Sequence, residues 1–181
     1  MKQTLNIFWF RRDLRLDDNH GLFEALQDKH EVLPIFIFDS DILERLPKDD
    51  ARVTFIYETL QAINNRLQKD YGSGISIYFG KPIDIFQQLV QTYHIETVYT
   101  NHDYEPYAIK RDQEVKDFLK EQKIDFKTYY KSLLKRTRNI RSIYEIYFRH
   151  AINEGDEFIM EPNFDNFQRV TKRQKIATSN G

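Results

Sequence analysis

The stretch that decides the fold is Thr4-Leu-Asn-Ile-Phe-Trp-Phe10 together with the turn that follows it, Arg11-Arg-Asp-Leu-Arg-Leu-Asp-Asp-Asn19. Its first seven residues are apolar and rich in aromatic side chains, and they end at a charged turn, as buried strands do. Asp17, Asp18 or Asn19 can then cap a helix. The chain is therefore predicted to open as a strand, a charged loop and a helix.

The alternation of strand and helix continues along the chain. A second buried strand is predicted at 32–38, and further strands are predicted at 75–79, 97–100 and 124–128. Helices are predicted at 51–69, where apolar residues recur mostly three and four positions apart, and at 83–93 and 108–122. Such alternation gives right-handed βαβ units. The predicted fold class is α/β, a doubly wound parallel five-stranded sheet with helices on both faces.

Composition narrows the class of protein. The 181 residues, 40% of them hydrophobic, are enough for one compact domain. The chain has no cysteine, which excludes a disulfide framework and a thiolate metal site and fits a reducing compartment. It shows no apolar run of membrane-spanning length and no signal peptide. We therefore expect a cytoplasmic protein without membrane contact, whose oligomeric state the sequence leaves open.

The charges are unevenly distributed. Residues 1–126 hold 16 Lys and Arg against 22 Asp and Glu, whereas residues 127–149 hold seven against one. The first part is therefore acidic and the second strongly basic. A basic block of this kind can contact nucleic acid, but an exposed basic helix face is the commoner explanation.

The fold class indicates where a ligand would bind. In doubly wound sheets ligands lie outside the carboxyl ends of the strands, where the strand order reverses. This rule selects four loops, at 10–20, 39–50, 80–82 and 101–107. The first loop carries the densest charge cluster, whose three arginines can hold a carboxylate or another anion bidentately. The alternative is that these arginines only form an ion-pair network that fixes the loop.

The loop at 101–107 carries the second polar cluster. Its sequence, Asn-His-Asp-Tyr-Glu-Pro-Tyr, offers carboxylates and aromatic faces that suit a flat polar heterocycle. It can also be read as a simple turn into the next helix. No catalytic triad, metal-ligand spacing of histidines or glycine-rich phosphate loop is present, which argues against NAD and P-loop nucleotides.

Both clusters resemble the signatures of one known family. Ile7-Phe-Trp-Phe-Arg-Arg-Asp-Leu-Arg-Leu-Asp-Asp-Asn19 looks like the opening motif of the photolyase/cryptochrome family, and Asn101–Tyr107 with Arg111-Asp112 looks like its fourth-strand motif. The segments Ala51–Phe55, Gly72-Ser73 and Phe79–Pro82 match the intervening elements in order. The resemblance covers about residues 4–128 and implies a Rossmann-like domain.

The resemblance also implies a function. In this family the N-terminal α/β domain binds an antenna chromophore, which passes excitation energy to FAD in a separate helical domain. The resemblance implies that the whole protein is a deoxyribodipyrimidine photolyase, which would bind damaged DNA and use light to split cyclobutane pyrimidine dimers. The sequence shows no motif of such a helical domain, so we expect no repair by these 181 residues alone. A cryptochrome photoreceptor, a generic nucleotide-binding module and an empty fold remain alternatives.

The family's pigment pocket can be carried over residue by residue. A deazaflavin-type pocket maps onto six positions: Phe10, Arg11, Phe36, Asp39, Asp103 and Glu105. A reduced folate fits less well, because folate-using members have Asn-Glu where this chain has Tyr107-Ala108. The resemblance therefore favours a deazaflavin or flavin antenna chromophore.

The resemblance implies a division of the chain near residue 130. Residues 1–130 correspond to the antenna domain, and residues 131–181 are a divergent basic segment with a flexible tail. Family members continue with a Val-x-x-Glu strand and a Pro-Tyr-rich segment, whereas this chain continues with Lys131-Ser-Leu-Leu-Lys-Arg-Thr-Arg138. Either this segment has diverged or its reading frame has changed.

Overall fold

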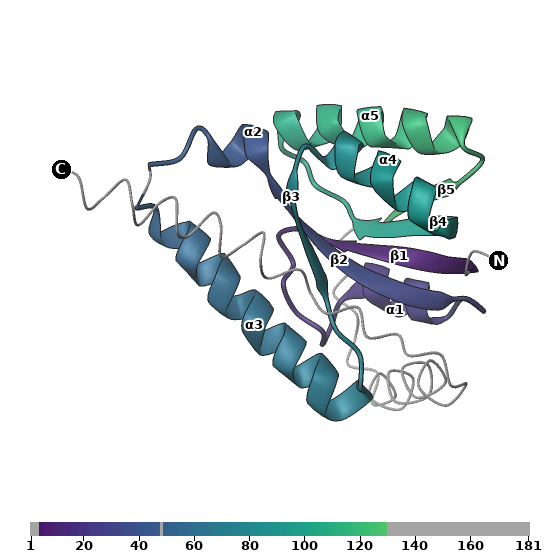
Figure 1. The fold of residues 1–181 in the computed structure, drawn as a ribbon, viewed down its shortest axis with the longest axis horizontal. Coiled ribbons are helices and arrows are strands. Elements are labelled where there is room, and N and C mark those ends of the chain that lie inside the picture. The colour runs from purple at the N-terminus through teal and green to yellow at the C-terminus, as the bar shows by residue number, and fades with distance from the viewer. Residues whose placement is uncertain (1–3, 48, 130–181) are drawn as a thin grey trace.

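The computed structural model describes residues 4–47 and 49–129. Strands and helices alternate along these residues (Figure 1). The strands are β1 (Thr4–Phe10), β2 (Glu31–Asp39), β3 (Ser76–Gly80), β4 (His94–Asn101) and β5 (Asp125–Tyr129). The helices are α1 (His20–Leu26), α2 (Ser40–Leu43), α3 (Ala51–Tyr71), α4 (Pro82–Thr92) and α5 (Pro106–Glu121). The predicted tail at 131–181 lies outside the described residues.

The five strands form one parallel sheet in the order β3-β2-β1-β4-β5. From β1 the chain adds β2 and then β3 on one side, and it returns to add β4 and β5 on the other side. The strand order therefore reverses between β1 and β4. This confirms the predicted α/β class, and the reversal marks the position where doubly wound folds bind ligands.

Two apolar cores lie on opposite faces of the sheet. α1 and α3 cover the face that carries Phe8, Phe10 and Phe36. α4 and α5 cover the other face, which carries Trp9 and Ile35. The side chains of β1 alternate between these two cores, because successive residues of a strand point to opposite faces. Figure 1 shows the two helical layers above and below the sheet.

The helix caps follow the predicted chemistry. Asn19 caps α1, and its side-chain oxygen accepts a hydrogen bond from the amide of Leu22 at 3.1 Å. Arg66 of α3 holds the loop before this helix through two contacts with Asp17, at 2.5 and 2.9 Å. The loop after β1 is therefore fixed at its far end by a cap and an ion pair.

The structure differs from the predicted elements in two places. The predicted loop at 39–50 contains the four-residue helix α2, which Asp39 caps. β4 begins at His94 instead of Thr97, and its register with β1 shifts between Leu5 and Ile7. Such a bulge breaks the alternation of apolar residues that marks a strand in a sequence.

Pro34 lies within β2, which is an interior strand. β3 begins at Ser76, which pairs with Ile35, so β3 does not extend alongside Pro34. On that side β2 is locally an edge, the position at which a strand tolerates proline.

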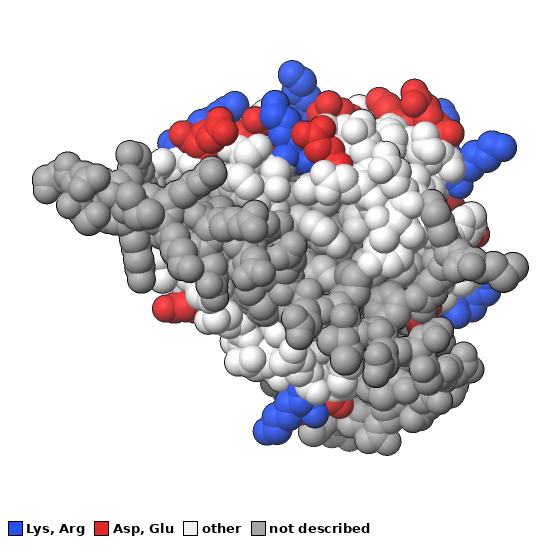
Figure 2. All heavy atoms as spheres, viewed as in Figure 1, with Lys and Arg blue, Asp and Glu red and all other residues white. Residues whose placement is uncertain are grey.

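The surface of the described residues is polar along its helices. Figure 2 shows Lys and Arg interleaved with Asp and Glu along the edge formed by α2 and α5. Within the described residues, no helix is long and apolar enough to cross a membrane.

Candidate functional site

A hollow of about 280 Å³, open to solvent, lies where the strand order reverses. It is lined by the last residues of β1, the start of the following loop and the segment Thr100–Asp103 at the end of β4. That volume includes space open to solvent, so the hollow is a shallow depression in the surface and not an enclosed pocket. Of the four loops predicted to bind a ligand, two contribute to this hollow: the loop after β1 and the loop after β4.

A buried ion-pair cluster closes one side of the hollow. Arg11 donates hydrogen bonds to the carboxylate of Asp112 and to the backbone oxygen of Asn101. Arg111 also donates to Asp112, at 3.1 and 2.9 Å. The side chains of Arg11 and Asp112 are only 7% and 13% exposed. Burial lowers the pKa of Arg11, and the charge of Asp112 opposes that shift.

Trp9 lies beneath this cluster. The guanidinium carbons of Arg11 and Arg111 lie 5.1 and 5.0 Å from the centre of the indole ring. The ring packs edge-on against Phe86 of α4, with 5.2 Å between the ring centres. Cation–π contacts at this range stabilise charges that have left water. Trp9 therefore connects the apolar core to the charged wall of the hollow.

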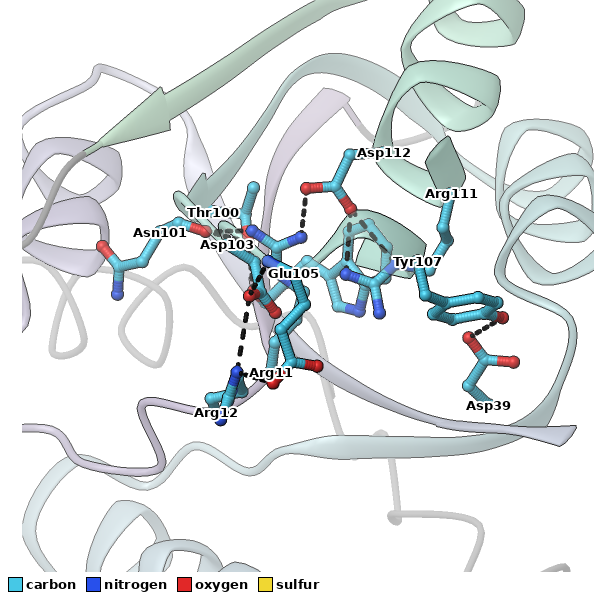
Figure 3. A network of polar contacts seen from close by, with 11 residues as sticks. Arg11, Arg12, Asp39, Thr100, Asn101, Asp103, Glu105, Tyr107, Arg111 and Asp112 are labelled. Carbon is cyan, nitrogen blue, oxygen red and sulfur yellow. Dashed lines mark hydrogen bonds and ion pairs between the residues drawn. The ribbon is translucent and has the colours of Figure 1, made fainter. Parts of the chain in front are cut away.

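A second ion pair lies at the mouth of the hollow. Arg12 contacts Glu105 at 2.6 Å and Asp103 at 3.6 Å. The side chains of Arg12 and Glu105 are 58% and 56% exposed, whereas that of Asp103 is 8% exposed. The ring of Tyr104 lies 5.8 Å from the guanidinium carbon of Arg12. Figure 3 shows Arg12 with its contacts to these carboxylates.

Asp39 and Tyr107 connect β2 to α5. The Tyr107 hydroxyl donates a hydrogen bond to Oδ2 of Asp39 at 2.8 Å, and Oδ1 of Asp39 accepts one from the amide of Asp41 at 3.1 Å. The Tyr107 ring lies between Arg45 and Arg111, at 5.6 and 6.0 Å. Burial and the neighbouring Asp39 carboxylate raise the pKa of Tyr107. Asp39 therefore already has two donors from the chain.

Two amides hold the loops on either side of the hollow together. Nδ2 of Asn101 donates to Oδ1 of Asn19 at 2.9 Å, and Oδ1 of Asn101 accepts from the amide of Gly21 at 2.9 Å. A Cβ atom at Gly21 would lie 2.7 Å from that oxygen and 3.1 Å from the ring of Phe8. The start of α1 and the end of β4 therefore approach closely only because residue 21 is glycine.

The structure brings the six predicted pocket residues to one edge of the sheet, in two groups. Phe10, Arg11 and Asp103 line the hollow, and Glu105 reaches it through Arg12. Phe36 pairs with Phe10 in the sheet and packs in the same core, and Asp39 ends the same strand. Whether these residues bind a ligand remains a prediction.

The alternative interpretation expected the charges of the first loop to pair with one another, but three of them pair with residues far away in the sequence. Arg11 pairs with α5, Arg12 with the segment after β4, and Asp17 with α3. Arg111-Asp112 was predicted only as part of the family resemblance, and the contacts of Tyr107 and Asn101 were not predicted. The spacing of residues within one loop does not indicate ion-pair partners that are distant in the sequence and that only the fold brings together.

Known proteins match this chain over most of its length. The family model described as DNA photolyase matches residues 6–150, a range that extends beyond the predicted end of the resemblance at 128. A deoxyribodipyrimidine photo-lyase of Synechococcus sp. is 39% identical over 114 residues, which are 63% of this chain and 23% of that protein. Cryptochrome-1 of Drosophila melanogaster is 32% identical over 126 residues, 67% of this chain and 23% of that protein.

Solved structures share the fold. The archaeal photolyase of Sulfolobus tokodaii, described with two FAD molecules, superposes with a TM-score of 0.64 at 33% identity. The match covers 80% of this chain and 34% of that one. A class III photolyase of Agrobacterium tumefaciens gives a TM-score of 0.63 at 25% identity, over 72% of this chain and 26% of that one. The chain thus spans about a quarter to a third of these relatives.

Proposed function

This chain belongs to the DNA photolyase family, and from that membership we propose that it binds an antenna chromophore in the hollow between β1 and β4. The observation that carries the proposal is the position of the hollow, at the reversal of strand order and beside the two motifs typical of the family. We assign this role to residues 1–130. Asp103 supports it as a buried carboxylate facing the hollow, where it can accept a hydrogen bond from a ring N–H.

A deazaflavin or a flavin is the proposed pigment. The structure of the similar Sulfolobus tokodaii photolyase contains two FAD molecules, which imply a novel light-harvesting cofactor in that protein. The hollow is open to solvent, and its mouth carries an arginine for an anionic side group. A reduced folate is the less favoured pigment, because residue 107 is a tyrosine whose hydroxyl already binds Asp39.

For the whole protein we propose light-driven repair of cyclobutane pyrimidine dimers, by a deoxyribodipyrimidine photolyase that holds FAD and damaged DNA in a further domain. The similarity to the Synechococcus photo-lyase supports this proposal. A cryptochrome photoreceptor is the second candidate, and the similarity to Drosophila Cryptochrome-1 supports it. The chain covers 23% of each of these two relatives, so repair and signalling are proposals about the larger protein.

The test is to identify the pigment and measure its binding. The absorption spectrum of the purified chain and the mass of any extracted ligand should indicate a deazaflavin or a flavin. For chain without ligand, titration with a deazaflavin, FMN or a reduced folate can be followed by the fluorescence of Trp9, the single tryptophan. Tight binding of either of the first two is expected.

A matched pair of variants locates the binding. Asp103→Asn removes the buried carboxylate at the hollow and should weaken the pigment about tenfold, the effect of losing a hydrogen bond to a charged group. Asp117→Asn, on the exposed side of α5, should bind like the parent. Absence of binding by all three pigments, or preferential binding of AMP, would contradict the proposed function.

A further inference from the structure

The ion pairs around the hollow form one network with a fixed part and an exchangeable part. Three arginines face three carboxylates: Arg11, Arg12 and Arg111 against Asp103, Glu105 and Asp112. The network is therefore electrically balanced without a ligand. An anionic ligand that enters the hollow must share a guanidinium or displace a carboxylate that already occupies one.

The buried part of the network is poorly suited to such an exchange. Arg11 is committed to Asp112 and to the backbone oxygen of Asn101, and Asp112 also holds Arg111. Moving Arg11 toward a ligand would leave these acceptors short of donors away from water. Removing one partner from a buried charge pair is strongly unfavourable. Arg11, the arginine that the resemblance predicts as a pigment contact, is therefore the arginine of the network that is least free to move.

The exposed part has the opposite properties. Arg12 and Glu105 are more than half exposed, and ion pairs between exposed side chains contribute little to stability. Exchange of one carboxylate for another anion at Arg12 therefore costs little. The Tyr104 ring lies near the guanidinium carbon, and the planar guanidinium matches the oxygens of a phosphate or carboxylate in pairs. Arg12 also lines the hollow.

We propose that Arg12 binds the anionic group of the ligand. In the absence of a ligand the Glu105 carboxylate occupies the Arg12 guanidinium, and the ligand's phosphate or carboxylate displaces Glu105. This inference rests on the proposed function, because it places the ligand in the same hollow. It gives Glu105 a role different from the ligand contact that the resemblance implies. In this arrangement Glu105 competes with the ligand, whereas a contact residue would bind it.

The two roles of Glu105 predict opposite results. Riboflavin and FMN differ only by a phosphate, so their affinities for the full chain, measured by Trp9 fluorescence, isolate the anion. FMN should bind the parent more tightly than riboflavin. Glu105→Gln should tighten FMN about two- to fivefold, the strength of an exposed ion pair, and leave riboflavin unchanged. Arg12→Ala should abolish the difference between the two flavins. Glu114→Gln, an exposed charge change on α5, is the matched control and should bind like the parent.

Inorganic pyrophosphate separates a failure of this inference from a failure of the proposed function. If neither the flavins nor a deazaflavin binds the parent but pyrophosphate does, with tighter binding to Glu105→Gln and none to Arg12→Ala, the anion site is supported and the pigment proposal is contradicted. If pyrophosphate, the flavins and the deazaflavin all fail to bind, both proposals are contradicted. Weaker FMN binding to Glu105→Gln, or an unchanged preference for FMN in Arg12→Ala, would overturn the inference alone.

Discussion

Phe8 and Arg12 lie four positions apart in the sequence and belong to different regions of the molecule. Phe8 is 1% exposed in the core beneath α1 and α3, whereas the side chain of Arg12 is 58% exposed at the mouth of the hollow. Arg11 lies between them and is charged but buried. Burial rather than residue type therefore separates the scaffold of the site from the part that can respond to a ligand.

The largest loss of stability is expected from a substitution in the core. Phe8→Ala should lower the free energy of unfolding by about 3–5 kcal/mol, because it removes a buried aromatic side chain and leaves a cavity. Chemical denaturation measures this loss. Phe55→Ala is the control, because Phe55 is 68% exposed on α3 and its loss should change stability by less than about 0.5 kcal/mol. Equal stabilities of the two variants would mean that β1 is not a core strand.

Arg11 and Arg12 allow a buried and an exposed side chain of the same type to be compared. Arg11→Ala should cost about 2–3 kcal/mol of stability, because it removes charged hydrogen bonds from Asp112 and Asn101 inside the protein. Arg12→Ala should cost less than about 1 kcal/mol, because its ion pair is exposed. Thermal and urea unfolding of the two variants compare them directly. A larger loss for Arg12→Ala would contradict the division into fixed and exchangeable parts.

High pH should affect the buried tyrosines. Burial raises the pKa of Tyr78 from its usual 10.0 to about 12. The unfolded chain therefore loses this proton at lower pH than the folded one, and the stabilising contribution is complete below pH 10 and lost as the pH rises toward 12. We expect the free energy of unfolding to fall by about 1–2 kcal/mol over this range.

Two tyrosine variants test the origin of that fall. Tyr78→Phe should make the dependence on pH less steep, measured as unfolding free energy at several pH values, while the raised pKa of Tyr107 keeps part of it in place. Tyr104→Phe changes an exposed ring and should leave it as in the parent. If both variants lose stability with pH as steeply as the parent does, Tyr78 is not responsible.

The smallest effect concerns a residue remote from the hollow. Lys123 follows α5 with a φ angle of 62°, a left-handed conformation that glycine adopts at lower cost. Lys123→Gly should raise stability by about 0.5–1 kcal/mol. Pigment affinity should not change, because the scaffold improves without altering the site. A thermal midpoint below that of the parent would show that the lysine side chain contributes more than the strain costs.

The sequence predicted the layers of the fold better than the ends of its elements. Buried strands such as β1 are marked by short apolar runs, and α3 by its helical periodicity. The start of β4 was not predicted, because Ile95 and Val98 pack in the same core although they are three positions apart. In a regular strand, residues at this separation point to opposite faces. The bulge that permits the shared core has no compositional signal. α2 is too short to show a period.

For the site, the sequence predicted the edge of the sheet but not the contacts made there. The carboxyl ends of β1 and β4 follow from fold class alone. The ion pair between Arg11 and Asp112 joins residues 101 positions apart, and that between Arg12 and Glu105 joins residues 93 apart. Which arginine is buried depends on the direction of each side chain from the strand, and only the structure supplies that direction.

The amide pair formed by Asn19 and Asn101 has a consequence for the kinetics of binding. It joins the far end of the loop after β1 to the end of β4, so the two segments that line the hollow are positioned before a ligand arrives. A preorganised site loses little conformational entropy on binding and requires no slow rearrangement. In stopped-flow experiments the observed association rate should therefore rise linearly with pigment concentration. In Asn101→Ala, where the walls must first be ordered, the rate should instead reach a plateau set by the ordering step.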